Sequence, residues 1–453
     1  MSKKTSKILK SILVRLIITV FVITIIIAGF FYIKQRNNTT DDDEPEPQKD
    51  IHVEFLLEIY NKIQENYWEE ISDEDLIELF ELAIDKFQTQ TATNTQESAI
   101  TVSDNDIASI LSQKIESIQI EERKEFSVNV GTTVLANLKP FGRSGLYTSE
   151  NVQELSDTVQ NIDPDADLYS ELELEKDATE EEIKESHEEK SKNLEEIIND
   201  ETKTEEEIKE AEEKIALLDR AYETLSEPKD REKYDESGIE STASSNIIKP
   251  GIAYLQIKKF SPTTFEEFAN ELDGLEDEPG LESLIIDFRD NIGGSIDYLP
   301  YFLGVFLGNN QHAYDWYHQE DYLPFRTKAE RMPATKKVKN TIILANEITQ
   351  SSAELMISTL KKFNIGTFIG TKTKGWGTIE KVYPLDIQID PVKETYSIFL
   401  VHSVTLRDTD GQPIEGRGVD PDIDITTEDW QDQLSDYFED RDLIEVIEEL
   451  LEK

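Results

Sequence analysis

The first signal in the chain is a long apolar run close to its start. Residues 16–33, LIITVFVITIIIAGFFYI, carry no charge, and at about 1.5 Å of rise per residue they span roughly 27 Å, close to the hydrocarbon thickness of a bilayer. Every charged residue of 1–15 is Lys or Arg, whereas 34–50 is rich in Asp and Glu. This pattern predicts a cytoplasmic basic segment (1–15), a single-pass anchor in the cell membrane (16–33), an acidic linker (34–50) and an extracytoplasmic remainder. A cleaved signal peptide is the alternative, but the run is longer than a usual signal core and no clear cleavage site follows.

Helical periodicity dominates the next region, which we assign to 51–165. Residues 52–88 place apolar residues at helical spacing in two blocks, and Ser72 followed by Asp73, Glu74 and Asp75 predicts an N-cap for the second block. A polar stretch at 89–103 predicts a loop. The remainder of the region predicts a mixture of helix and strand.

From residue 247 onward, strand-like and helical stretches alternate. GIAYLQIKKF, LESLIIDFRD and VKNTIILANE read as strands, and AELMISTLKKF reads as a helix. This alternation predicts an α/β core at 247–427, with a mainly parallel sheet and crossover helices. The acidic segment at 428–453 ends in an amphipathic helix, DLIEVIEELLEK, which we expect to pack on the core.

Composition excludes several classes of function. The formal net charge of −50 argues against nucleic acid as a partner, because phosphate contacts require clustered Lys and Arg. The chain has no cysteine and five scattered histidines, so neither a disulfide nor a zinc site is expected. We expect no metal and no cofactor.

A Glu-rich region at 166–240 separates the N-terminal region from the core. It opens with DLYSELELEKDATEEEIK and closes with AYETLSEPKDREKYD. Asp177 or Thr179 is the expected cap of a first helix, and Pro228 is the expected start of a last short one, so the region predicts a helical hairpin.

These motifs resemble a J-domain. J-domains stimulate a cytosolic chaperone ATPase through a His-Pro-Asp tripeptide, and the aligned position here reads Glu195-Glu196-Ile197. The resemblance therefore implies a degenerate module that acts as a spacer or binds proteins. We expect no chaperone ATPase as a partner.

Three blocks of the α/β region have residue types suited to a nucleophilic serine. LIIDFRDNIGG is a strand that ends in Gly293-Gly294, where backbone amides can approach a carbonyl as in an oxyanion hole; a plain glycine turn is the alternative. NEITQSSAE places Ser351 between a strand and a helix, where an ordinary N-cap serine is the alternative. The third block, GTKTKGWGTIE, follows the next predicted strand.

Together the blocks resemble the C-terminal processing (tail-specific) serine peptidases. They are similar to that family's R-x-N-P-G-G, S-A-S-A-S-E and G-E-K-T-F-G-K-G-S-V-Q motifs, with Ile292 in place of the proline, and GQPIEGRGVDPDI is similar to its closing G-R-S-I-Q-G-K-G-I-E-P-D. The resemblance implies that Ser351 is the nucleophile and that amides of Gly293 or Gly294 with Ser352 form the oxyanion hole. It also implies a PDZ domain, for which 104–165 shows no recognisable carboxylate-binding loop.

The family's catalytic lysine is replaced. It aligns with Trp376, and its assisting glutamine aligns with Glu380. Because tryptophan has no basic nitrogen, we interpret Lys374, two residues earlier and about 6–7 Å away on an extended chain, as a substitute base. A solvated surface lysine is the alternative, and Glu380 would raise the pKa of a nearby lysine, which works against its use as a base.

Two functions follow from this sequence. The first is a membrane-anchored, extracytoplasmic serine endopeptidase (a hydrolase) that acts on protein or peptide substrates through Ser351 and Lys374. The second is a catalytically inactive relative that serves as a protein-binding scaffold in the cell envelope.

Overall fold

The structure, a computed structural model, describes residues 50–91, 106–163, 166–200, 202–406 and 411–452. Within these ranges no helix is both long and apolar enough to cross a membrane. The predicted anchor at 16–33 lies outside the described residues, as do the basic segment and nearly all of the acidic linker.

The N-terminal region is mainly helical, and its helices surround one buried cluster. Its elements are α2 (Ile51–Asn66), α3 (Asp73–Thr91), α4 (Ile107–Glu116), α5 (Arg123–Ala136), β1 (Gly145–Thr148) and α6 (Ser149–Gln160). Helix α3 begins at the predicted cap, because the Asp75 amide donates to Ser72 Oγ at 3.1 Å. Apolar side chains of α2 to α5 pack with residues of strand β10 (Tyr396–Thr405).

The Glu-rich region forms the predicted helical hairpin, which we call the J-like domain (residues 166–240). It contains α7 (Leu168–Glu171), α8 (Glu180–Ile198), α9 (Glu205–Ser226) and α10 (Pro228–Ser237). Thr179 caps α8 by accepting the Glu182 amide at 3.2 Å. The residues aligned with the His-Pro-Asp motif, 195–197, lie in the last turn of α8 rather than in the loop that follows it.

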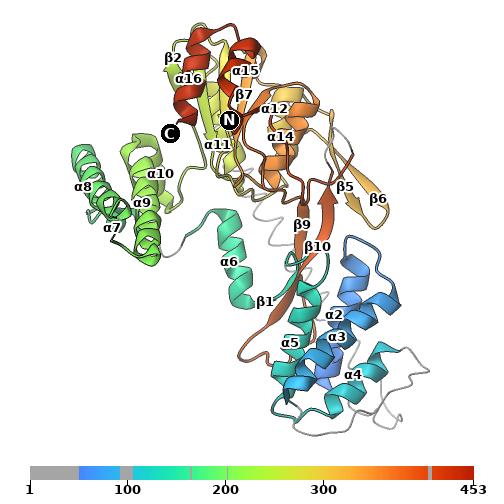
Figure 1. Cartoon of the computed structure of the whole chain (residues 1–453). Helices are drawn as coiled ribbons and strands as arrows, with labels where there is room; N and C mark the ends of the chain where they lie inside the picture. Colours follow the sequence, from blue (N-terminus) through green and yellow to red (C-terminus); the bar gives the residue numbers. More distant parts are fainter. Residues whose placement is uncertain (1–49, 92–105, 164–165, 201, 407–410, 453) are drawn as a thin grey trace, which may run out of the picture. The chain divides into compact units, whose positions relative to one another are not determined.

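The core is a six-stranded sheet, and the prediction of a mainly parallel α/β core is confirmed (Figure 1). The strand order is β11-β8-β7-β4-β3-β2, and only β2 and β3 pair antiparallel. These strands are β2 (Ala243–Lys249), β3 (Ile252–Ile257), β4 (Ser283–Asp287), β7 (Asn340–Ala345), β8 (Thr367–Gly370) and β11 (Ile423–Asp424).

Helices cover both faces of this sheet. Side chains alternate along each strand, so Leu284 and Ile286 join one buried cluster while Ile285 joins another. The first face packs against α11 (Thr264–Gly274), α12 (Leu299–Leu307), α13 (Pro333–Lys337) and α14 (Ser352–Lys362). The second face packs against α15 (Trp430–Tyr437) and α16 (Arg441–Leu451), which confirms the predicted docking of the C-terminal helix.

A second, antiparallel sheet was not predicted as a separate layer. Strand β10 pairs with β1, with β9 (Thr378–Pro384) and with β5 (His312–His318), and β5 pairs with β6 (Asp321–Arg326). Because β9 begins two residues after Trp376, this sheet fixes the end of the third sequence block relative to the N-terminal helices.

Candidate active site

Ser351 occupies a strained turn between β7 and α14. Its backbone has φ 58° and ψ −124°, a combination that residues with a Cβ rarely adopt. A serine held in a sharp strand-to-helix turn presents its hydroxyl at the end of the sheet, which is the local geometry of a nucleophilic serine. Ser351 is half-buried, its side chain and Glu354 form a capping box at the start of α14, and no lysine amine is a partner of its Oγ within the described ranges.

The glycine loop after β4 packs directly against this serine. A Cβ added at Gly293 would lie 2.6 Å from Ser351 Cβ and 3.1 Å from Ser351 Oγ. At Gly294 an added Cβ would lie 2.1 Å from the Phe260 carbonyl oxygen. Both positions also have positive φ, so only glycine allows the loop to approach the nucleophile this closely.

The predicted oxyanion donors differ in availability. The Gly293 amide donates to Asn291 Oδ1 at 2.8 Å, so it is already committed. The Gly294 amide has no acceptor in the part of the chain that the structure describes. Ser352 is the first residue of α14, so its amide has no acceptor inside the helix. The geometry therefore leaves Gly294 and Ser352 as the two free donors beside Ser351.

Hydrogen bonds join the glycine loop to the serine turn. The Asp290 amide donates to Asn346 Oδ1 at 3.1 Å, and Asn346 Nδ2 donates back to Asp290 Oδ1 at 2.9 Å. The Gln350 amide donates to the Asn291 carbonyl at 3.0 Å. Arg289, by contrast, is bound to Asp287 and does not contact the serine turn. The glycine loop and the serine turn are thus held as one unit.

Glu354 holds the site together, and this role was not predicted from the sequence. Its fully buried carboxylate accepts hydrogen bonds from four donors: the Ser351 amide (2.9 Å), Thr373 Oγ1 (2.5 Å), the Gly375 amide (2.7 Å) and the Trp376 amide (2.8 Å). Burial raises the pKa of Glu354, and the donors oppose that shift. The glutamate therefore links the nucleophile turn to the loop that carries the family's lysine position. The spacing S-x-x-E is its only sequence signal, and that spacing also fits an ordinary capping box.

Trp376 fills the lysine position and is held on two sides. The Arg143 guanidinium carbon lies 3.4 Å from the centre of the indole ring, and Trp376 Nε1 donates to Glu380 Oε1 at 3.1 Å. Arg143 in turn donates to Glu415 Oε1 at 3.1 Å. A cation stacked on an indole and a hydrogen bond from its nitrogen both fix the ring. Burial raises the pKa of Glu380.

Lys374 does not lie with Ser351. Its side chain is exposed and has no hydrogen bond or ion pair among the described residues, while its amide donates to the Thr349 carbonyl at 3.0 Å. A cavity of about 350 Å³ is lined by Gly294, Ser351, Ser352, Trp376 and Glu380, but not by Lys374. The structure therefore brings together every predicted site residue except Gly293, which backs the serine, and Lys374, which lies outside.

The same cavity, here called the Ser351 cleft, is lined by residues from several elements. Strand β9 contributes residues 378–381, helix α6 contributes Val159, and α14 contributes Leu355. Lys381 is an exposed amine at its edge. Among the described residues, no group of three His, Cys, Asp or Glu side chains is placed to hold a metal ion.

Comparison with known proteins identifies the two main parts of the chain. Residues 251–425 match the peptidase family S41, and residues 167–235 match the DnaJ domain. These two segments are therefore similar to the C-terminal processing serine peptidases and to J-domains, as the motifs predicted.

The relatives share only part of their length with this chain. The carboxy-terminal processing protease CtpA of Bacillus subtilis is 27% identical over 190 residues, which are 42% of this chain and 38% of that protein. A probable CtpA-like serine protease of Staphylococcus epidermidis is 25% identical over 183 residues, 40% of this chain and 35% of that protein. The chain thus spans well under half the length of both. Among solved structures, a photosystem II D1 C-terminal processing protease is 18% identical, with a TM-score of 0.34 over 41% of this chain and 48% of that one.

Proposed function

We propose that the protein is a membrane-anchored extracytoplasmic protein whose Ser351 cleft binds an extended segment of another protein without cleaving it at the rate of a peptidase. The apolar run at 16–33 and the positive charges before it support the anchor and its orientation. One observation carries the proposal: Ser351 Oγ has no amine partner in the described ranges, and Trp376 occupies the lysine position.

The missing amine matters because a serine hydroxyl is a poor nucleophile without a base. Removing the histidine base from a serine protease lowers kcat by roughly a millionfold. Lys374 is exposed and outside the cleft, and Glu380 is an acid with its pKa raised by burial. Neither group replaces the lysine where it stands.

Two features of the cleft, a free strand edge and two free amides, support the binding of an extended segment. Strand β9 pairs with β10 along one edge, and its other edge has no strand partner within the described residues. An extended segment can add to such an edge through main-chain hydrogen bonds, while cleft side chains select among residues. The free amides of Gly294 and Ser352 provide two further donors for a carbonyl oxygen.

A slow serine endopeptidase with Lys374 as its base is the second candidate. The strained turn at Ser351 and the two free amides favour it, since both suit chemistry more than binding. The Lys374 amide already contacts the Thr349 carbonyl, two residues before Ser351. This candidate requires the Lys374 side chain to turn into the cleft when a substrate binds.

The test uses fluorescently labelled casein, an unstructured protein, with wild type and the variants Ser351→Ala and Lys374→Ala. We expect all three to bind it with similar affinity by anisotropy, without turnover and without labelling by a fluorophosphonate. Turnover lost in Ser351→Ala would overturn the proposal, and additional loss in Lys374→Ala would establish the second candidate.

A matched pair of variants on α6 tests the location of binding. Val159→Trp fills the cleft from α6, whereas Leu155→Trp introduces the same side chain one turn earlier, at a position that lines no part of the cleft. Only Val159→Trp is expected to weaken casein binding. Equal binding by both variants would place the interaction elsewhere.

A further inference from the structure

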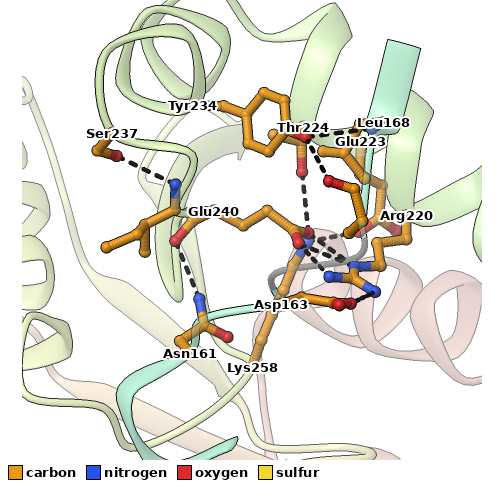
Figure 2. Close-up of polar contacts among 12 residues, drawn as sticks. Asn161, Asp163, Leu168, Arg220, Glu223, Thr224, Tyr234, Ser237, Glu240 and Lys258 are labelled. Carbon is orange, nitrogen blue, oxygen red and sulfur yellow. Dashed lines mark hydrogen bonds and ion pairs between the residues drawn. The ribbon is translucent and has the colours of Figure 1, made fainter. Parts of the chain in front are cut away.

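A single arginine joins the two connections of the J-like domain to the rest of the chain (Figure 2). Arg220 Nε on α9 donates to both carboxylate oxygens of Glu240, at 2.9 and 3.1 Å, and Arg220 Nη1 donates to Asp163 Oδ2 at 3.1 Å. Asp163 precedes the domain, and Glu240 follows its last helix. Asn161 Nδ2 also donates to the Glu240 carbonyl at 3.2 Å. Because a bidentate contact fixes the geometry of both partners, Arg220 fixes the two connections of the domain relative to each other.

The next contact lies on the core strand β3 and its extension. The Lys258 amide donates to the carbonyl of Thr242, two residues after Glu240, at 2.9 Å. Lys258 Nζ donates to Glu223 Oε2 on α9 at 2.5 Å, which Figure 2 also shows. The segment Lys258–Phe260 is therefore held by the J-like domain and by the connection that Arg220 fixes.

Phe260 connects this segment to the glycine loop. Its amide donates to the Gly293 carbonyl at 2.9 Å, and its carbonyl accepts the Ser295 amide at 2.7 Å. These two bonds flank Gly294, whose free amide faces away from Phe260 because the pairing uses its neighbours. A displacement of Phe260 would thus be transmitted directly to the Gly294 amide.

The glycine loop has a cavity on each side. A cavity of about 720 Å³ is lined by Arg220 and Glu223 of the J-like domain, by Lys258, and by Asp290 and Ile292 of the loop. The Ser351 cleft begins at Gly294 on the other side. The loop thus has open space on both sides, and its backbone is held by hydrogen bonds to Phe260 and to the serine turn.

We propose that Arg220 is a positioning residue, which holds the Gly294 amide at the Ser351 cleft through Glu240 and the segment Lys258–Phe260. The J-like domain then tunes what the cleft binds, in addition to any role as a spacer. The effect on ligand affinity rests on the proposed function, whereas the mechanical coupling does not.

Charge explains the direction of the effect. Arg220 is the cation that bridges Glu240 and Asp163, and Lys259 is a second cation that interacts with both carboxylates. Without Arg220 the two carboxylates repel each other and lose the contact that joins them, while Lys259 compensates only part of their charge. Removing Arg220 should therefore open the junction and release Lys258–Phe260.

The test is hydrogen exchange read on peptides that contain the Phe260 and Ser295 amides, together with casein anisotropy. Arg220→Met is expected to speed exchange of both amides by about tenfold and to weaken casein binding. Arg220→Lys keeps the charge without the bidentate contact, so it should give an intermediate value.

Lys229→Met is the matched control. Lys229 on α10 pairs with Glu271 on α11, so it is also an ion pair between the J-like domain and the core, but it does not touch Lys258–Phe260. Exchange of Phe260 and Ser295 should be unchanged in this variant. If Arg220→Met does not fold, Glu223→Gln removes the contact to Lys258 instead and has the same expected outcome.

The outcomes distinguish the coupling through Arg220 from the proposed binding function. Unchanged Phe260 and Ser295 exchange in folded Arg220→Met would overturn the coupling, and so would an equal change in Lys229→Met. Faster exchange in Arg220→Met, in a protein whose wild type does not bind casein, would sustain the coupling and reject only the proposed function.

Discussion

Placing the family's lysine at residue 376 should make the Ser351 cleft a working active site. The perturbation is Trp376→Lys, alone and combined with Glu380→Gln. The loop that carries residue 376 is already fixed by Glu354, which accepts the Gly375 and Trp376 amides. A lysine there would extend into the Ser351 cleft without rebuilding the backbone.

The charges around residue 376 determine the pKa of the introduced lysine and therefore the size of the expected effect on activity. Glu380 Oε1 lies 3.1 Å from Trp376 Nε1, so a lysine ammonium would come within about 4 Å of this carboxylate. At an effective dielectric constant of about 20, such a pair contributes about 4 kcal/mol, which raises the lysine pKa by about 3 units. Glu380→Gln removes this attraction between carboxylate and ammonium. The charge of Arg143, 3.4 Å from the indole centre, then favours the neutral amine.

We therefore expect little activity from Trp376→Lys and up to about a thousandfold more from Trp376→Lys/Glu380→Gln. The assay is cleavage of labelled casein across pH 6 to 9 (roughly the range of a base with lowered pKa), with fluorophosphonate labelling of Ser351 in parallel. Adding Ser351→Ala should abolish both signals, and Glu380→Gln alone should give neither. Wild type as active as the double variant, or a folded double variant that binds casein but never reacts, would refute the reasoning.

Three further predictions concern stability. Glu354→Gln places an amide NH₂ among four hydrogen-bond donors, so each donor left unpaired should cost about 1–3 kcal/mol in urea denaturation; an unchanged midpoint would contradict the structural role of this carboxylate. Burial, Lys381 and His318 lower the pKa of His402 from 6.5 to about 4. The unfolded chain therefore binds a proton between these values that the folded chain refuses, so the free energy of unfolding should fall as pH drops through this window, and His402→Gln should flatten the slope. Ile447→Ala, at a fully buried position of α16, should cost about 2–5 kcal/mol by the same denaturation assay, and a smaller loss would mean that α16 is weakly docked.

Strong local signals explain what could be predicted from the sequence. The cap at Ser72, the cap at Thr179 and the start of a helix at Pro228 are each set by neighbouring residues, and the structure has all three. The parallel sheet follows from alternating apolar strands and helices. Ser351 is assigned from the resemblance of NEITQSSAE to the family's S-A-S-A-S-E motif, and the structure places it in the turn between β7 and α14.

Contacts between distant segments explain what could not be predicted from the sequence. Arg143 belongs to the N-terminal region, yet it stacks on Trp376, and no local pattern indicates that pair. Residues around Val130 are rich in β-branched types but form helix α5, because Phe126, Val130 and Val134 share one buried face. The second sheet was missed because β10 joins strands from three regions of the chain. The exposed position of Lys374 depends on side-chain direction, which spacing alone does not give.

The arrangement at Arg220 has a consequence for how this architecture arose. Asp163, which precedes the J-like domain, and Glu240, its last residue, both bind the same guanidinium, so the two ends of the domain lie close together. A segment with adjacent ends can be inserted into a host protein, or removed from it, without disrupting the fold of the host. The helical hairpin should therefore be removable as a unit. Joining residues 163 and 240 through a short glycine-serine linker should yield a smaller folded protein.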